Sequence, residues 1–234
     1  MSRSSPRLAP ACFPNATPCL QRTMRAAYGV IFLAIGGLAG CASGGTDYVV
    51  DVAGMTPTPL VDPLPLTVAV HYTPEFSAYT SKQESLNGDT WQVSFNSVQR
   101  DDMHRMLTSA FEEVIESPTA EPADDLKYDV LLIPRVENFS FLTPTESGTK
   151  FFAVSMRHFI SFYGPEGTDF GAWEINSYGR SRNFFGRRVR EMAAEACVDA
   201  MRDLATSLVV GLPEEIISRE IVDVDGIELP GALQ

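Results

Sequence analysis

Two neighbouring segments of this chain alternate between apolar and polar residues. In residues 150–163, Phe152 and every second residue after it form one face, and polar residues such as Arg157 and Ser161 form the other. A period of two is that of a strand with one buried face. The glycine-containing turn at 164–169 leads into a second alternating segment, 170–178. Together they predict an antiparallel hairpin that must bury one face against another layer.

Two other segments have the spacing of amphipathic helices. The first begins near Ser97, which can cap it, and apolar residues then recur every three or four positions until Pro118. The second runs from Arg187 to about Val210, and we expect Gly211 and the proline that follows to end it.

Further strands are predicted before and between these helices. They are residues 66–72, 91–95 and 128–141. Asn87-Gly88 is a hairpin-type turn signal, and the change of parity near residues 137–138 predicts a bulge. The order predicts an α+β fold: one mixed, mostly antiparallel sheet with two amphipathic helices on one face.

The first 40 residues have the layout of a secretory signal. The uncharged apolar run 28–38 follows Arg22 and Arg25, and small residues precede Cys41. This run is too short to span a bilayer, which needs about 20 apolar residues. We expect residues 1–40 to be removed, with Met24 as a possible true start.

The tetrapeptide Leu38-Ala39-Gly40-Cys41 resembles the lipobox of bacterial lipoproteins. The resemblance implies that Cys41 carries a diacylglyceryl group and becomes the first residue of the mature protein. Ala42 and Ser43 lack the aspartate that retains enteric lipoproteins in the inner membrane. The resemblance therefore implies an outer-membrane protein facing the periplasm, with the inner membrane as the alternative.

The mature chain divides by composition into three parts. Residues 41–65 are rich in proline and small residues and predict a lipidated tether, in which Tyr48–Val50 has the character of a short strand. Residues 66–211 contain the predicted strands and helices of the α+β domain. Residues 212–234 predict an acidic tail.

Charge and cysteine content exclude several classes of protein. Removal of the signal takes away four arginines and no acid, so the formal net charge changes from −12 to −16. Nucleic-acid binding is not expected, because phosphate contacts need clustered basic residues. Cys12 and Cys19 lie in the signal and Cys41 is the lipid site, which leaves Cys197 without a disulfide partner.

The sequence gives no catalytic or metal-binding pattern. His71, His104 and His158 lack metal-ligand spacing, and no nucleophile elbow or phosphate-binding loop occurs. We therefore expect no metal, no cofactor and no enzyme activity, with a periplasmic hydrolase using His71 or His158 as the alternative. His158 and Cys197 lie on apolar faces, which predicts structural roles in the core.

One basic segment differs from the acidic background. Residues 178–190 contain five arginines, although only 14 basic residues follow the signal. Arginine suits carboxylates and phosphates, so this segment predicts a surface for an anionic partner: a lipid headgroup or an acidic protein. Its candidate residues are Arg180, Arg182, Arg187 and Arg188. The alternative is pairing with the protein's own acids.

At the level of its element pattern, the domain is similar to small envelope domains: the amino-terminal domain of TolB, the curli secretion lipoprotein CsgG and lipoproteins auxiliary to ABC-type transport. This resemblance implies a binding or scaffolding component of an envelope transport or assembly machine, with an unidentified envelope protein partner and an open oligomeric state. A lipoprotein that binds a small ligand or lipid is the alternative.

Overall fold

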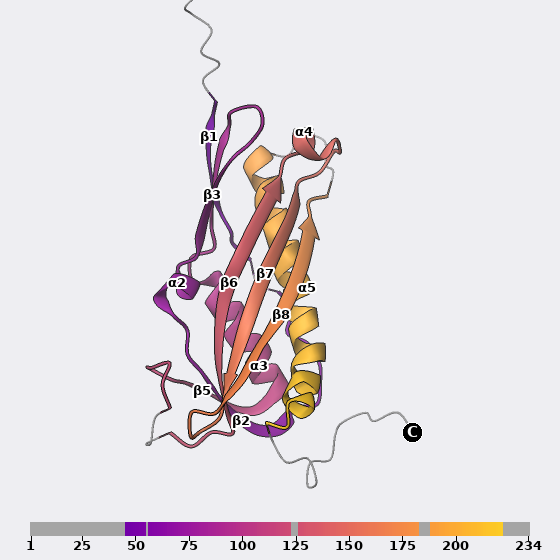
Figure 1. The fold of residues 1–234 in the computed structure, drawn as a ribbon. Coiled ribbons are helices and arrows are strands. Elements are labelled where there is room, and N and C mark those ends of the chain that lie inside the picture. The colour runs from indigo at the N-terminus through magenta and orange to yellow at the C-terminus, as the bar shows by residue number, and fades with distance from the viewer. Residues whose placement is uncertain (1–44, 55, 123–125, 183–187, 222–234) are drawn as a thin grey trace, which may run out of the picture. The chain divides into compact units, whose positions relative to one another are not determined.

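The computed structural model describes residues 45–221, except 55, 123–125 and 183–187. Over these residues the chain forms two β-sheets and four helices (Figure 1). The larger sheet has the order β5 (Phe111–Glu116), β2 (Leu64–Val70), β6 (Val130–Leu142), β7 (Ala153–Tyr163), β8 (Asp169–Arg180). The smaller sheet has the order β1 (Asp47–Asp51), β4 (Thr90–Ser94), β3 (Thr80–Glu84). The helices are α2 (Pro74–Ser77), α3 (Val98–Ala110), α4 (Pro144–Ser147) and α5 (Val189–Ser218).

The α+β class predicted from the sequence is confirmed, and so is the hairpin that dominated the prediction. β7 and β8 pair antiparallel, with His158 opposite Ile175. β6 pairs antiparallel with β7, and its register shifts between Val136 and Asn138, where the bulge was expected. The pairing of β2 with β5 and β6 is parallel, so the larger sheet is mixed.

The predicted single sheet is instead two sheets. β3 and β4 pair antiparallel around the Asn87-Gly88 turn, and β1 adds to β4 in parallel. Trp91 of β4 joins this small sheet to the larger one, because its ring centroid lies 5.1 Å from that of Phe141 and 5.3 Å from that of Phe152.

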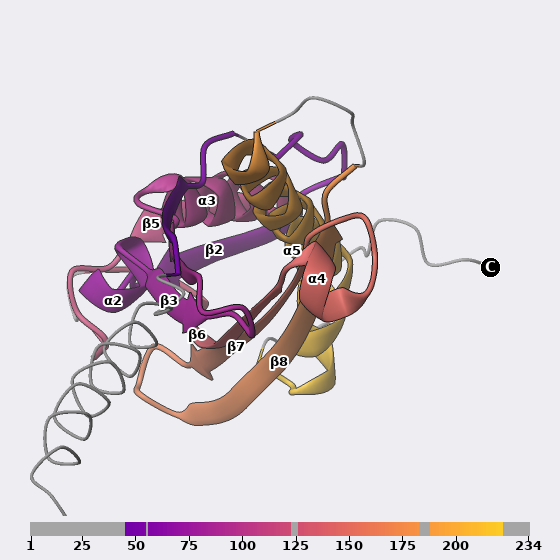
Figure 2. The ribbon, with the colours of Figure 1, turned by 90° about the horizontal axis from the view of Figure 1, so that it is seen from above.

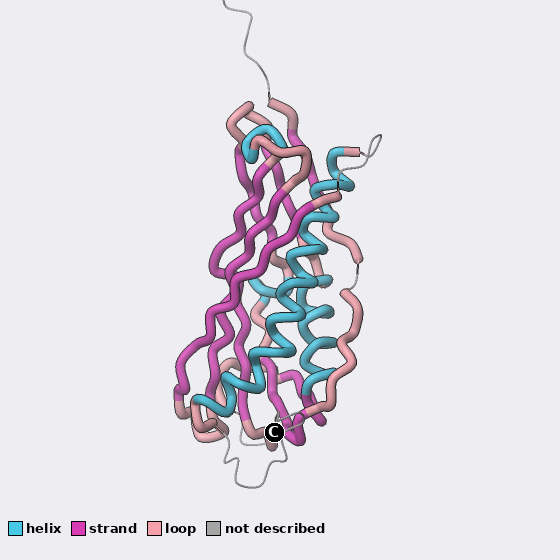
Figure 3. The backbone as a smooth tube through the Cα atoms, turned by 90° about the vertical axis from the view of Figure 1, so that its right-hand side faces the viewer, coloured by secondary structure: helices cyan, strands magenta, loops and turns pink. Residues whose placement is uncertain are grey.

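Helices α3 and α5 cover one face of the larger sheet, as predicted (Figure 2). Figure 3 shows both helices running along the strands. The core beneath them contains Val68, Met106, Leu132, Ile160 and Leu208, all at most 1% exposed. Burial of these apolar faces is the main stabilising term of the fold.

The predicted end of α3 was wrong. The helix stops at Ala110, and the following residues form β5 in place of two further helical turns. Val114 and Ile115 satisfy a helical pattern and a strand pattern equally well. These residues form a strand because they pair in parallel with β2.

Within the predicted tether, the short strand expected at Tyr48–Val50 is confirmed as β1, which is docked on the domain. β1 lies in this segment, and Val50 and Val52 are each only 1% exposed. Farther on, the backbone N–H of Thr56 donates to Asp102 Oδ2 of α3 at 3.2 Å. The first described part of the segment is therefore packed onto the domain, whereas residues 57–63 are mostly exposed.

The predicted end of α5 was also wrong. The helix continues through Gly211 and Pro213 to Ser218, so the first residues of the predicted acidic tail are helical. Leu212 and Ile216 are at most 1% exposed, and their burial in the core favours continuation. The remainder of the tail from residue 222, the signal and Cys41 lie outside the described residues.

None of the described helices is both long enough and apolar enough to cross a membrane.

Candidate functional site

The arginine segment lies where β8 ends and α5 begins. Arg180 is the last residue of β8, Arg182 follows two residues later, and Arg188 is the N-cap residue of α5. All three are exposed, as is Arg190 in the first turn of the helix. Arg187 lies outside the described residues. We call Arg180, Arg182, Arg188 and Arg190 the arginine surface.

A hollow in the molecule adjoins these arginines. Its lining residues are Phe151, Arg180, Ser181, Arg182 and Asp199. The guanidinium carbon of Arg180 lies 5.8 Å from the centroid of the Phe151 ring, which is a cation–π arrangement. Ser181 is buried, and its hydroxyl oxygen accepts the Phe152 N–H at 3.0 Å, so the backbone beneath the hollow is fixed.

Three carboxylates of α5 accept hydrogen bonds from the backbone at the end of β8 and just after it. The N–H groups of Tyr178, Arg180 and Arg182 point away from β7 and are capped by carboxylates spaced four residues apart. The pairs are Tyr178 to Asp203 at 2.9 Å, Arg180 to Asp199 at 3.1 Å and Arg182 to Glu195 at 3.1 Å. We call this arrangement the carboxylate ladder. It satisfies three N–H groups at the carboxyl-terminal end of β8.

The described arginines fall into two groups, those that form an ion pair with a carboxylate and those that do not. Arg100, Arg157, Arg202 and Arg219 each form an ion pair with a carboxylate. Within the described residues, the guanidinium groups of Arg180, Arg182, Arg188 and Arg190 form no ion pair. Arg188 and Arg190 also lie at a helix N-terminus, where the helix dipole disfavours cations. Their placement thus contributes no evident stability to the described domain.

Each of the three histidines lies beside a polar group of the fold. His158 is fully buried, and its Nε2 lies 3.0 Å from Nε2 of Gln99, whose amide donates to it. Burial lowers the pKa of His158 to about 4. His71 Nδ1 lies 2.9 Å from the Ser117 carbonyl oxygen, and His104 Nδ1 lies 3.8 Å from Glu116. Among the described residues, no group of three or more His, Cys, Asp and Glu residues is arranged to hold a metal ion.

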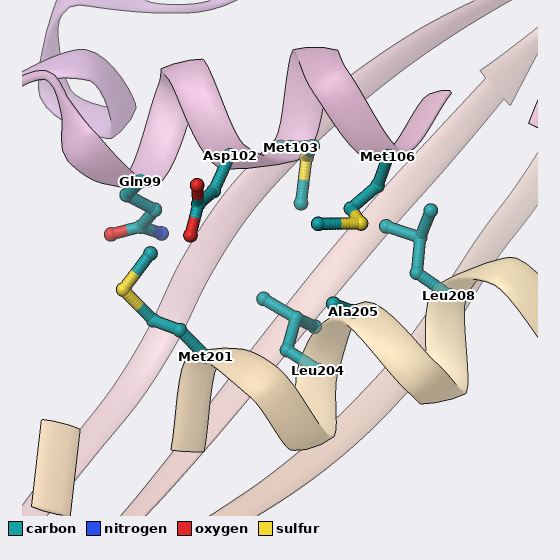
Figure 4. Close-up of a pocket in the computed structure, with 8 residues that line it drawn as sticks. All are labelled: Gln99, Asp102, Met103, Met106, Met201, Leu204, Ala205 and Leu208. Carbon is teal, nitrogen blue, oxygen red and sulfur yellow. The ribbon is translucent and has the colours of Figure 1, made fainter. Parts of the chain in front are cut away.

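A small internal pocket lies between α3 and α5 (Figure 4). Gln99 and Asp102 form its polar end, and its apolar walls are Met103, Met106, Met201, Leu204, Ala205 and Leu208. It has room for about one water molecule. Asp102 does not face an open site, because it accepts from Arg105 of its own helix and from Thr56.

Sequence reasoning missed Phe151 and the carboxylate ladder. The ladder had a readable signal, since Glu195, Asp199 and Asp203 repeat every four residues along one face of α5. Phe151 had none, because its role depends on pairing across the sheet that brings residue 151 beside residue 180.

No protein-family model matches the chain. No curated protein matches it either. A Xanthomonas campestris protein of the DUF330 family is similar in structure, with a TM-score of 0.50 and 12% identity, over 76% of this chain and 100% of that one. This likeness shows a shared fold.

Two other solved structures are less similar. A hypothetical protein from Chlamydia trachomatis has a TM-score of 0.41 and 11% identity, over 66% of this chain and 99% of that one. A Caulobacter crescentus protein that is assigned as a lipoprotein has a TM-score of 0.29 and 11% identity, over 50% of this chain and 81% of that one.

Proposed function

We propose that this protein is a lipid-anchored, non-enzymatic component of the bacterial envelope, acylated at Cys41, that binds and scaffolds other components of a transport or assembly machine. The outer membrane, on its periplasmic face, is the proposed location. The Leu38-Ala39-Gly40-Cys41 motif behind an apolar signal supports the anchor. The acyl chains supply the attachment, at about 0.8 kcal/mol for each buried methylene group.

The arginine surface is the observation that carries the binding role. Its four guanidinium groups are exposed and, within the described residues, without carboxylate partners, in a chain that is otherwise strongly acidic. Bidentate donors of this kind suit phosphates and carboxylates. The proposed ligand of this surface is an anionic component of the envelope.

The small-ligand alternative has weaker support. The pocket between α3 and α5 has room for about one water molecule, so a ligand of ordinary size would have to displace core side chains. The arginine surface requires no such rearrangement.

Crosslinking in intact membranes tests the proposed role. The quadruple variant R180Q/R182Q/R188Q/R190Q should retain a nearly unchanged Tm, because exposed charges contribute only about 0–1 kcal/mol each. It should recover much less of the anionic component that the unaltered protein recovers, and added salt should mimic the loss.

The matched control is R135Q/R157Q, which removes two exposed arginines from the strands of the same sheet. It should recover the component as the unaltered protein does. Equal recovery by all three proteins would contradict a binding role of the arginine surface. A strong fall in Tm of the quadruple variant would show instead that these arginines are structural.

A further inference from the structure

The chain enters the described domain beside the turn between β3 and β4. The backbone of Gly45 lies so close to Gly88 that a Cβ at Gly45 would come within 1.7 Å of the Gly88 carbonyl oxygen. The next N–H, that of Thr46, donates to Asp89 Oδ1 at 2.7 Å. The first described residues and this turn therefore share one end of the domain (Figure 1).

The length of chain before this entry is short. Only four residue steps separate Cys41 from Gly45, and an extended chain spans at most about 3.6 Å per residue. A Cys41 that carries acyl chains in a bilayer therefore holds Gly45 within about 14 Å of the headgroups. The pairing of β1 with β4 and the hydrogen bond of Thr56 with Asp102 begin the docked chain close after Cys41 and so shorten the tether that the sequence predicted.

The turn at this end presents an apolar side chain to solvent. Leu86 is 89% exposed, next to Asn87-Gly88. Its backbone N–H donates to Glu146 Oε1 of α4 at 3.0 Å, so the turn is held against α4. Leu142, which ends β6 just before α4, is 41% exposed.

The arginine surface lies at the same end of the domain. β6 and β8 both end there, and α5 begins there, as Figure 1 shows near the top. The pairing of residues 152 and 181 through two backbone-linked hydrogen bonds, at 3.0 Å each, joins the start of β7 to the end of β8. The arginine surface and the exposed Leu86 therefore lie at the same end of the domain as Gly45, the first described residue.

We propose that this end of the domain rests on the protein's own bilayer, with the Leu86 side chain in the headgroup region and the arginine surface on the phosphates of anionic lipids. The proposal rests on the lipid anchor of the proposed function. It commits the arginine surface to lipid phosphates, and an acidic protein at this surface would contradict it. Basic side chains near an anionic membrane each contribute about fivefold in local binding, and a short tether adds a high effective concentration.

Depth-sensitive fluorescence on the acylated mature protein tests this arrangement. The variants L86C and V210C are each labelled with a nitrobenzoxadiazole dye and placed in vesicles of phosphatidylethanolamine and phosphatidylglycerol. Cys197 is buried, and burial raises the pKa of its thiol to about 12, so it should stay unlabelled. Val210 is the control because it is 65% exposed and lies 21 residues, about 32 Å, along α5 from Val189.

The expected result is blue-shifted emission at position 86, quenched several-fold more by nitroxide-bearing lipids than emission at position 210. Combining L86C with R180Q/R182Q/R188Q/R190Q should reduce this difference, as should vesicles of phosphatidylcholine alone. Equal, water-like emission at both positions overturns the proposal. Water-like emission in vesicles together with shielding in native membranes also overturns it, and identifies a protein on this surface.

Mass spectrometry of the same preparations separates failure of this proposal from failure of the proposed function. An acylated Cys41 with water-like emission at position 86 refutes only the bilayer contact. A preparation without acylated Cys41 refutes the anchor and, with it, the bilayer contact that depends on it.

Discussion

Gly179 of β8 lies directly against Ala196 of α5. A Cβ at Gly179 would come within 2.2 Å of the Ala196 carbonyl oxygen, and it would come equally close to the Ala200 backbone nitrogen. Only glycine lets the strand and the helix backbone approach this closely. The contact sets the distance at which the carboxylates of α5 reach the N–H groups of β8.

Gly179→Ala should therefore destabilise the domain strongly. The added methyl group meets helix backbone, which cannot move without displacing α5, and we expect a loss of about 3 kcal/mol. In a domain of this size the corresponding fall in Tm is roughly 6–12 °C. Gly211→Ala is the comparison, because there the Cβ meets the Trp173 side chain at 2.6 Å and the helix gains propensity. Thermal unfolding should show the smaller loss for Gly211→Ala, and equal losses would contradict the backbone contact.

The carboxylate ladder should protect the open edge of β8. Two residues of a strand advance by about 6.7 Å and four residues of a helix by about 6.0 Å, so acids at every fourth position match alternate strand N–H groups. The double variant D199A/D203A should lose about 1–2 kcal/mol and should associate edge to edge. Denaturant titration measures the loss of stability, and light scattering of the folded protein measures the association.

The control for the ladder is D199N/D203N, which removes the same charges but keeps an acceptor oxygen at each position. It should scatter less than the alanine variant. If both variants behave alike, net charge and not the capping of the strand edge is responsible.

Asp102 should hold the segment after β1 against α3. It is 5% exposed, forms an ion pair with Arg105 and accepts the Thr56 N–H. Asp102→Ala leaves a cation and an N–H without their partner, at a cost of about 3 kcal/mol. Hydrogen exchange at residues 52–60 should accelerate. Asp101→Ala, which alters an exposed acid one residue earlier, should cost less than about 1 kcal/mol and leave that exchange unchanged.

His158 should make stability dependent on pH below neutrality. Its pKa is lowered by burial to about 4, against an ordinary value of 6.5. Below pH 6.5 the unfolded chain therefore takes up a proton that the folded chain does not. The free energy of unfolding should fall by about 1.6 kcal/mol between pH 6.5 and 5 from this residue alone, with a slope that approaches about 1.4 kcal/mol per pH unit. Denaturant titrations at several pH values should show that the free energy of unfolding falls more steeply with pH for the unaltered protein than for His158→Gln. An identical pH dependence of the two proteins would refute the role of His158.

The elements predicted best are those in which local pattern and burial agree. β7 alternates because His158 and its neighbours of the same parity lie beneath helices while Arg157 faces outward. The bulge near Asn138 was readable for the same reason, since a change of parity must accompany a change of register.

The elements predicted poorly depend on distant partners. β1 was expected as a short strand, but its parallel pairing with β4 was not, and β5 was expected as helix and is a strand because it pairs with β2. Neither partner can be identified from local spacing. At the candidate site, the sequence identified the arginines by composition, but the small number of residues between Cys41 and the first docked strand became evident only with β1 in place.

Identification of the amino-terminal residue of the mature protein tests most directly the central claim, that the protein is anchored through an acylated Cys41. Intact-mass and peptide analysis of protein extracted from membranes should find a chain that begins at Cys41 and carries a diacylglyceryl group on its sulfur, and Cys41→Ser should abolish the modification and release the protein from the membrane fraction. A mature chain with an unmodified Cys41 thiol, or a Cys41→Ser protein that stays with the membranes, would contradict the account.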